Sequence, residues 1–257
     1  MQKKVADTDS VLALALDVGK SMVRCGAEIN RVEETVLRIC HAYGVRSTEV
    51  FSVISMITAT VTDSDGVTHT QMRRIYTRGV NFRRLENLNA LSRKICAEKP
   101  DIAKIRQELA GICVENKRFD IFGCMGYVVG AMGFTVFFGG SLLDSLASAP
   151  IAVVLYLINL YVKSNGVNKL FFTALSSAFA GFAAISFVHF GFGHDANMIM
   201  IGDIMLLIPG LMLINSVREM LCGDIMSGLL RLLESVVLAL SIACGFAVAI
   251  MTLGKVW

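Results

Sequence analysis

One carboxylate interrupts a long apolar stretch in the second half of the chain. Asp203 lies within residues 198–217, and Pro209-Gly210 follows six residues later. An ionisable group in such a stretch is costly and is usually paired or functional. Proline removes one backbone hydrogen bond from a helix, and glycine relaxes the next turn, so carbonyls become free to bind a polar ligand. The pattern predicts a polar binding point with a group that can take up and release a proton.

A polar segment follows the proline and leads into the last apolar run. It contains Asn215, Arg218, Glu219, Asp224, Ser227 and Gly228. An arginine can bind a carboxylate, and an amide can replace water around a polar solute. We interpret Asp203, Pro209, Gly210 and this segment as the pathway of a small solute and of protons. The simpler alternative is a kinked helix whose nearby charges form ion pairs at the cytoplasmic surface.

Five apolar runs indicate an α-helical membrane protein. A helix needs about 20 apolar residues to cross about 30 Å of hydrocarbon. The runs are residues 121–143, 145–162, 170–188, 198–217 and 235–254. The chain is 54% hydrophobic, and its mean hydropathy is +0.62. Five such runs joined by short connections favour five transmembrane helices over the buried helices of a water-soluble protein.

The positive charges predict the orientation of these helices. Lys and Arg are retained on the cytoplasmic side of a membrane. Most of the 24 basic residues precede residue 119. An internal amino terminus also places Lys163, Lys169, Arg218 and Arg231 inside, and leaves Lys255 outside. We therefore expect the amino end in the cytoplasm and the carboxyl end outside.

The charged first part, residues 1–118, predicts a small cytoplasmic α/β domain, with the membrane domain spanning residues 119–257. Apolar periodicity predicts helices over residues 9–24, 28–43, 85–97 and 102–114. Residues 51–62 and 67–76 are rich in β-branched side chains and predict two strands, with a turn at residues 63–66.

Signals of an enzyme or of a bound cofactor are missing from the sequence. The four histidines have no metal-ligand spacing, and the seven cysteines form no CxxC pair. No Ser-His-Asp or Cys-His arrangement and no ATP-binding motif is present. We expect no catalytic residues, no metal, no cofactor and no nucleic-acid partner.

The motifs resemble those of the threonine/serine exporter family. Residues 206–228, LLIPGLMLINSVREMLCGDIMSG, closely resemble its PG…N…D…GD..SG signature. The cytoplasmic part adds matching positions at Gly26, Arg31, Glu33, Arg78 and Asn81. The likeness covers nearly the whole chain in order. Glu219 departs from it where aspartate is more usual, and Met212 replaces a frequent proline.

The resemblance implies a subunit of a secondary-active exporter in the bacterial inner membrane. Threonine and serine are the naming substrates, and related split pairs are associated with C4-dicarboxylates such as succinate. Coupling to protons is expected for the family. Fused members carry a second membrane domain, whereas this chain ends at Trp257. The resemblance therefore implies the longer subunit of a two-component form, in a hetero-oligomer with a separately encoded, smaller membrane partner.

The alternative is a membrane-anchored sensor or scaffold, whose cytoplasmic domain binds a ligand. An anchor does not need Asp203 beside Pro209, so these two residues distinguish the two classes.

The distribution of Lys and Arg yields a test of topology. A reporter enzyme that works only outside the cytoplasm, fused after Trp257, should be active, because an odd number of spans carries the carboxyl end across. The same reporter fused after residue 118 should be inactive. Activity of the Trp257 fusion only with a cytoplasmic reporter would refute five spans.

Overall fold

The structure is a computed structural model that describes residues 8–63, 65–76, 79–114, 120–165 and 168–253. The predicted site residue Arg78 lies outside these ranges. The chain forms two compact units. The first unit comprises Met1–Glu115 together with Ile214–Leu232, and the second comprises Asn116–Leu213 and Leu233–Trp257. Each unit is described by itself.

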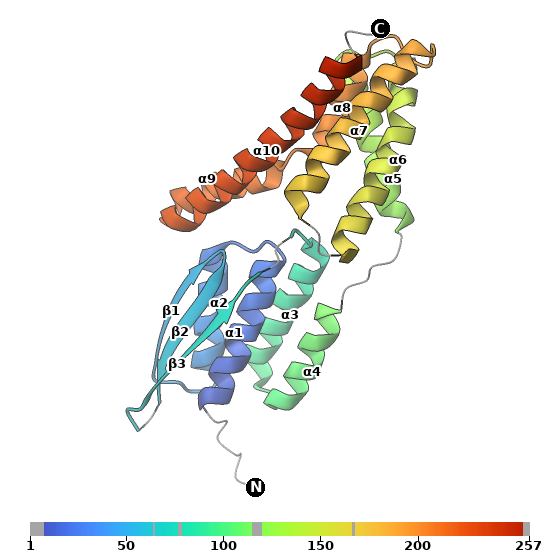
Figure 1. The fold of residues 1–257 in the computed structure, drawn as a ribbon. Coiled ribbons are helices and arrows are strands. Elements are labelled where there is room, and N and C mark those ends of the chain that lie inside the picture. The colour runs from blue at the N-terminus through green and yellow to red at the C-terminus, as the bar shows by residue number, and fades with distance from the viewer. Residues whose placement is uncertain (1–7, 64, 77–78, 115–119, 166–167, 254–257) are drawn as a thin grey trace. The chain divides into compact units, whose positions relative to one another are not determined.

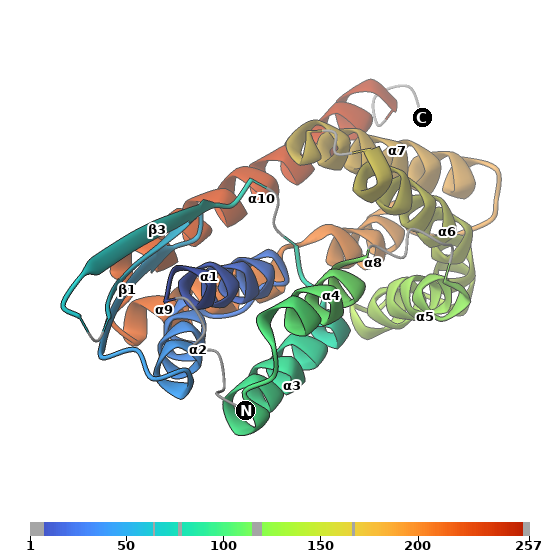
Figure 2. The same cartoon turned by 90° about the horizontal axis from the view of Figure 1, so that it is seen from below.

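The amino-terminal part of the first unit is an antiparallel sheet with helices on one face. Its elements are α1 (Thr8–Arg24), α2 (Ile29–Ala42), β1 (Ser47–Val53), β2 (Met56–Thr62), β3 (Thr68–Arg74), α3 (Phe82–Glu98) and α4 (Ile102–Cys113). The strand order is β1-β2-β3. Figures 1 and 2 show the sheet on one side of α1, and α3 and α4 on the other.

Helix α1 forms the centre of this core because it is apolar on nearly every face. Leu12, Leu14 and Leu16 are fully buried, although they cannot all lie on one helical stripe. Ile57 from β2 and Ile95 from α3 complete the core around them. Burial of each such side chain stabilises the fold by about 1.5–3 kcal/mol. The predicted combination of helices and strands in this part of the chain is present as helices with a small sheet.

The prediction of two strands was wrong, because the sheet has three. Residues 51–62 contain a hairpin, in which Val53 pairs with Met56 across the two-residue turn Ile54-Ser55. Two-residue hairpin turns usually contain glycine, asparagine or aspartate. Ile54 is instead buried in the core, so the turn has the composition of a strand.

Long apolar helices make up the second unit. They are α5 (Ile121–Phe137), α6 (Leu142–Asn165), α7 (Lys169–His189) and α8 (Ala196–Leu207). Helices α9 (Gly210–Leu221) and α10 (Ile225–Leu253) each belong partly to the first unit and partly to the second. Helices α5, α6 and α7 each pack against α8, as Figure 1 shows.

The helix lengths support three to four membrane spans. Leu142–Val162, Lys169–His189 and Ile225–Leu253 are long and apolar enough to cross a membrane. The pair α8 and α9 passes the same test together, as one span bent by 50°. Helix α5 has 17 residues, or about 25 Å of helix. A helical membrane protein is therefore supported, and the count of five spans stays a prediction.

The sequence predicted one helix over the first apolar run, residues 121–143. In the structure this helix, α5, ends at Phe137. Gly139 adopts a φ of +103°, and the amide of Gly140 donates to the Thr135 carbonyl over 2.9 Å, which closes the helix end. Ser141 and Asp144 then begin α6 as a capping box: Asp144 Oδ2 accepts from the Ser141 amide over 2.8 Å, and Ser141 Oγ accepts from the Asp144 amide over 3.2 Å.

Asp144 also binds the connection between α7 and α8. Its Oδ1 accepts from the amides of His194 over 2.6 Å and Asp195 over 3.0 Å. The residue is only 2% exposed. Asp144 is therefore a buried cross-link between two turns of the second unit, which we name the Asp144 clamp.

A glycine permits the close approach of α5 and α8. A Cβ atom at Gly202 would lie 2.8 Å from the Ala131 carbonyl oxygen and would collide with Thr135 Oγ1. Gly126 on α5 has no atom within 4 Å of the equivalent position. Of the two, only Gly202 is required by packing.

This difference predicts opposite effects of two alanine substitutions. Gly202→Ala should destabilise the protein by about 1–3 kcal/mol, because α5 or α8 must move away. Gly126→Ala should be neutral or stabilise by about 0.5–1 kcal/mol, because alanine is the better helix former. Thermal unfolding of the full chain in detergent measures both. Equal shifts for the two variants would contradict the packing at Gly202.

Candidate functional site

Asp203 on α8 is fully buried among the helices of the second unit. Neither of its carboxylate oxygens has a hydrogen-bond partner within the described part of the chain. The nearby Thr135 hydroxyl donates instead to the Ala131 carbonyl over 2.9 Å. Burying a lone charge is far more costly than burying a neutral carboxyl group. This environment therefore accepts Asp203 in its protonated, neutral form.

The helix breaks six residues after Asp203. Helix α8 ends at Leu207, and α9 begins at Gly210 after a bend of 50°. Pro209 has no amide proton, so it donates no bond to the carbonyl of Met205, four residues earlier. The sequence-predicted Asp203, Pro209 and Gly210 thus lie in one short stretch of the second unit, with free backbone acceptor capacity beside a buried carboxyl group.

The rest of the signature folds as a tight helical hairpin in the first unit, made by the end of α9 and the start of α10. Gly223 turns the chain with a φ of +99°. A Cβ atom at Gly228 would lie 2.7 Å from the Ser216 carbonyl oxygen, so a larger residue would separate the two helices. Ser216 and Ser227 are both buried.

A buried ion pair closes this hairpin. Glu219 Oε1 lies 2.9 Å from Arg231 Nη2, and the two side chains are 2% and 10% exposed. Removing one partner of such a pair typically costs 3–5 kcal/mol, because the other charge stays buried. The sequence analysis placed Glu219 on the solute pathway, and its alternative was that the charges near Pro209 form ion pairs. The pairing of Glu219 with Arg231 is such an ion pair, although neither partner was named in advance.

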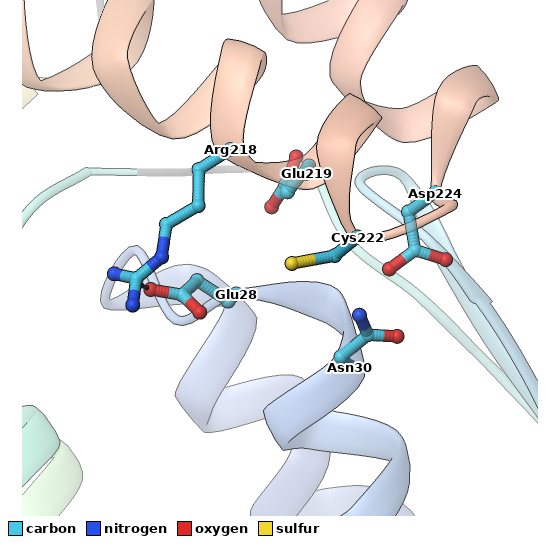
Figure 3. Close-up of a pocket in the computed structure, with 6 residues that line it drawn as sticks. All are labelled: Glu28, Asn30, Arg218, Glu219, Cys222 and Asp224. Carbon is cyan, nitrogen blue, oxygen red and sulfur yellow. Dashed lines mark hydrogen bonds and ion pairs between the residues drawn. The ribbon is translucent and has the colours of Figure 1, made fainter.

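A small polar pocket lies between the hairpin and the start of α2. Glu28, Asn30, Arg218, Glu219, Cys222 and Asp224 line it (Figure 3). Arg218 Nη1 donates to Glu28 Oε1 over 2.7 Å. Among the predicted residues, Arg218, Glu219 and Asp224 are therefore brought together. Asn215 lies earlier on α9 and does not line the pocket, and its side chain makes no hydrogen bond to the described residues.

Glu28 is a pocket residue that the sequence analysis missed. A glutamate directly before a helix is common, and nothing in its local sequence points to Arg218, 190 positions away.

The motif residues of the amino-terminal part of the chain have separate structural roles. Gly26 turns between α1 and α2 with a φ of +90°, and a Cβ there would lie 3.1 Å from the Gly79 carbonyl oxygen. The backbone amide of Asn81 donates to the Cys25 carbonyl over 3.1 Å. The side chain of Asn81 accepts from the backbone amide of Arg84 and so caps the start of α3. Gly26 and Asn81 therefore join the α1–α2 turn to the start of α3. Arg31 is exposed on α2.

Glu33 lies on the inner part of α2, where its Oε1 accepts from the Ser52 amide over 2.7 Å. Burial raises the pKa of Glu33, the Ser52 bond lowers it, and the charge of Asp224 raises it further. Burial also raises the pKa of Asp224. Glu33 and Asp224 are thus two neighbouring carboxyl groups that are both costly to ionise. Such an arrangement is more characteristic of a functional site than of an ion pair that stabilises the fold.

The raised pKa of Glu33 predicts a pH-dependent gain in stability for Glu33→Gln. A carboxyl group whose pKa is higher in the folded state favours folding in acid, and this contribution is lost as the pH rises through the folded pKa. Glutamine stays neutral and its oxygen can still accept from Ser52. The variant should therefore unfold at a higher temperature than the wild type at pH 7–8, with the difference shrinking toward about pH 4. Glu34→Gln, at the exposed Glu34–Arg38 pair, is the control. A difference independent of pH would refute this reading.

No cluster of metal-ligating side chains occurs in the described ranges. Between residues 8 and 253, the described histidine, cysteine, aspartate and glutamate side chains do not gather in groups of three or more that could hold an ion. The site is built from carboxyl groups, arginines and backbone groups.

Comparisons with known proteins identify the family. The sequence model of the family "Putative threonine/serine exporter" matches residues 13–253. The chain is also 21% identical, over 248 residues, to the "Probable threonine/serine exporter" of Mycobacterium tuberculosis. The match covers 95% of this chain and 46% of that protein, so the chain spans about half the length of this relative. No solved structure matches the chain.

The family match extends over the buried carboxyl group, the helix break and the polar hairpin as well as over the amino-terminal sheet. The resemblance seen in the sequence motifs is thereby confirmed at the level of the family. The chain belongs to the threonine/serine exporter family of membrane proteins.

Proposed function

We propose that this chain is a subunit of a secondary-active, proton-coupled exporter of small polar metabolites, either threonine and serine or C4-dicarboxylates such as succinate. Its proposed place is the bacterial inner membrane, with the amino end inside and the carboxyl end outside. Membership of an exporter family supports the class of function. The buried, unpartnered carboxyl group of Asp203 is the observation that carries the mechanism.

Asp203 is proposed to carry the proton. In the structure its carboxyl group is fully buried and lacks a hydrogen-bond partner among the described residues, which favours the neutral form. Contact with water on either side of the membrane would stabilise the charged form and release the proton. A group that alternates between these two surroundings couples proton movement to a conformational change.

The helix break is proposed to bind the solute. A zwitterion or a dicarboxylate sheds water when it enters the protein, so the protein must replace those hydrogen bonds. The Met205 carbonyl, left without a bond from Pro209, supplies an acceptor, as half-helix ends do in other transporters. Further along the proposed pathway, the Asn215 amide supplies donors and an acceptor, and the Arg218 guanidinium supplies donors for a carboxylate.

A separately encoded, smaller membrane subunit is proposed to complete the transporter as a hetero-oligomer. Helix α5 presents an open apolar face suited to such a partner. Phe122, Val129 and Phe137 are exposed on it. Gly126 and Gly133 have no neighbour within 4 Å of a Cβ position. Small residues on an exposed membrane helix let a second helix approach closely.

The cytoplasmic motif is proposed to act in gating or in solute entry. Glu33 has an electrostatic interaction with Asp224, which lies in the α9–α10 hairpin. Ionisation of Glu33 is disfavoured by burial, so its retention as a charged residue costs stability. Arg31 and Arg78 match the same motif and are assigned to the same role.

A membrane-anchored sensor would have no use for the polar features of the second unit. An anchor gains stability from apolar helices alone, whereas a lone buried carboxyl group beside a helix break reduces it. Asp203 therefore favours the exporter.

Replacement of Asp203 tests the proposal. Asp203→Asn should abolish proton-driven efflux of radiolabelled threonine, serine or succinate from loaded cells, because an amide cannot carry the proton. Folded protein in the membrane should be unchanged, since an amide of the same size fits the site. Asp195→Asn is the matched control, because Asp195 lies at the start of the same helix and its side-chain oxygen can still cap it. Normal efflux with normal pH dependence in Asp203→Asn would refute the proton-carrier role.

A further inference from the structure

The Arg218 side chain is held at the start of α2 by a single contact. Its Nη1 donates to Glu28 Oε1 over 2.7 Å, and no second bond between these two side chains is formed (Figure 3). The Arg218 side chain is 63% exposed, and the Glu28 side chain is 23% exposed. The guanidinium group is therefore paired but still open to solvent.

A guanidinium group binds a carboxylate best through two parallel N–H bonds. The Glu28 carboxylate uses one donor of Arg218, and in the described structure the remaining donors have no bond to another carboxylate. A solute carboxylate is not attached to the chain, so it can orient both of its oxygens toward the guanidinium group. It can therefore accept the two parallel N–H bonds that Glu28 does not accept. The Glu28 contact is therefore a weaker version of the bond that a solute carboxylate would make.

Within the described ranges, the Glu28 side chain has no other hydrogen bond or ion pair that fixes it. It occupies the position before the first turn of α2, with φ −69° and ψ 143°, but its side chain does not cap the helix. The neighbouring carboxylate that could replace it, Glu219, is 2% exposed and paired with Arg231. Within the pocket, Glu28 is thus the carboxylate that can move away from Arg218 at low cost.

We infer that Glu28 is a built-in competitor for the carboxylate of the transported solute, which holds Arg218 at rest and is displaced when the solute binds. The inference rests on the proposed function, in which Arg218 meets a solute carboxylate. It assigns to the residue that precedes α2, Glu28, a direct part in solute affinity. We name the Glu28–Arg218 contact the carboxylate latch.

The latch raises the solute concentration needed to occupy Arg218. A competitor that occupies a site with equilibrium constant K multiplies the apparent dissociation constant of the solute by 1 + K. For an ion pair as exposed as this one K is about 1.4 to five, so the factor is about two to six. Removal of the Glu28 charge should lower the half-saturating solute concentration by that factor.

The test measures efflux against internal solute concentration for matched variants in the full chain. The solutes are radiolabelled threonine, serine and succinate, and the data come from whichever of them the wild-type chain exports. Glu28→Gln should lower the half-saturating concentration about two- to sixfold. Glu34→Gln removes the same charge from the exposed Glu34–Arg38 pair on the same helix, and should leave it unchanged. Glu28→Asp, with its shorter reach, should give a smaller decrease.

A charge exchange separates the latch from a structural ion pair. Glu28→Arg with Arg218→Glu keeps an ion pair but places a negative charge where the solute carboxylate binds. The exchanged protein should reach the membrane in normal amount and export poorly. Normal export by the exchanged protein would overturn the latch, as would a wild-type saturation curve for Glu28→Gln.

The outcome for Arg218→Gln tells the two proposals apart. Loss of efflux in this variant, together with an unchanged curve for Glu28→Gln, would overturn the latch and leave the proposed role of Arg218 standing. Normal saturation of Arg218→Gln would overturn that role and the latch with it.

Discussion

Hydrocarbon offers no hydrogen bonds, so each polar group at membrane depth has to find its partner within the protein. Several polar side chains of the second unit find their partners close by, within their own helices. The hydroxyls of Ser148, Ser176 and Ser177 donate to carbonyls of their own helices. Asp144 takes bonds from two turns of the chain. Asp203 is different, because its carboxylate oxygens have no hydrogen-bond partner in the described helices. Pro209 is different because it has no amide proton to donate to the Met205 carbonyl. The function proposed for the protein depends on these two exceptions.

Glycine determines how closely the polar groups can be enclosed. Gly202 lets α5 approach α8 next to Asp203, and Gly228 lets α10 approach α9 beside the Glu219–Arg231 pair. Within a bilayer the contact of apolar side chains adds little driving force, so close backbone packing matters more than side-chain size. The signature therefore combines two kinds of residue: glycines that set the spacing of helices, and charged residues that this spacing brings into contact.

Much of the fold could be predicted because its helices have strong local patterns. Helix α1 extends to Arg24, as the apolar periodicity predicted, and α7 differs from its predicted run by one residue at each end. The Ile54-Ser55 turn could not be predicted, since it has strand-like composition and is stabilised by burial. Asp203 and Pro209 were found because each conflicts with its own surroundings in the sequence. Glu28 was missed for the opposite reason: it fits its local surroundings, and its partner is distant along the chain.

The Asp144 clamp ties the helices of the second unit together at one end. Four hydrogen bonds converge on one carboxylate there, from Ser141, His194 and Asp195, and tie the α5–α6 turn to the α7–α8 turn. At the far end of α8 the chain is interrupted by Pro209 and bent by 50°. The clamp fixes the Asp195 end of α8 to the start of α6. Any rotation of α8 about that end would therefore displace Asp203 less than the break at Pro209.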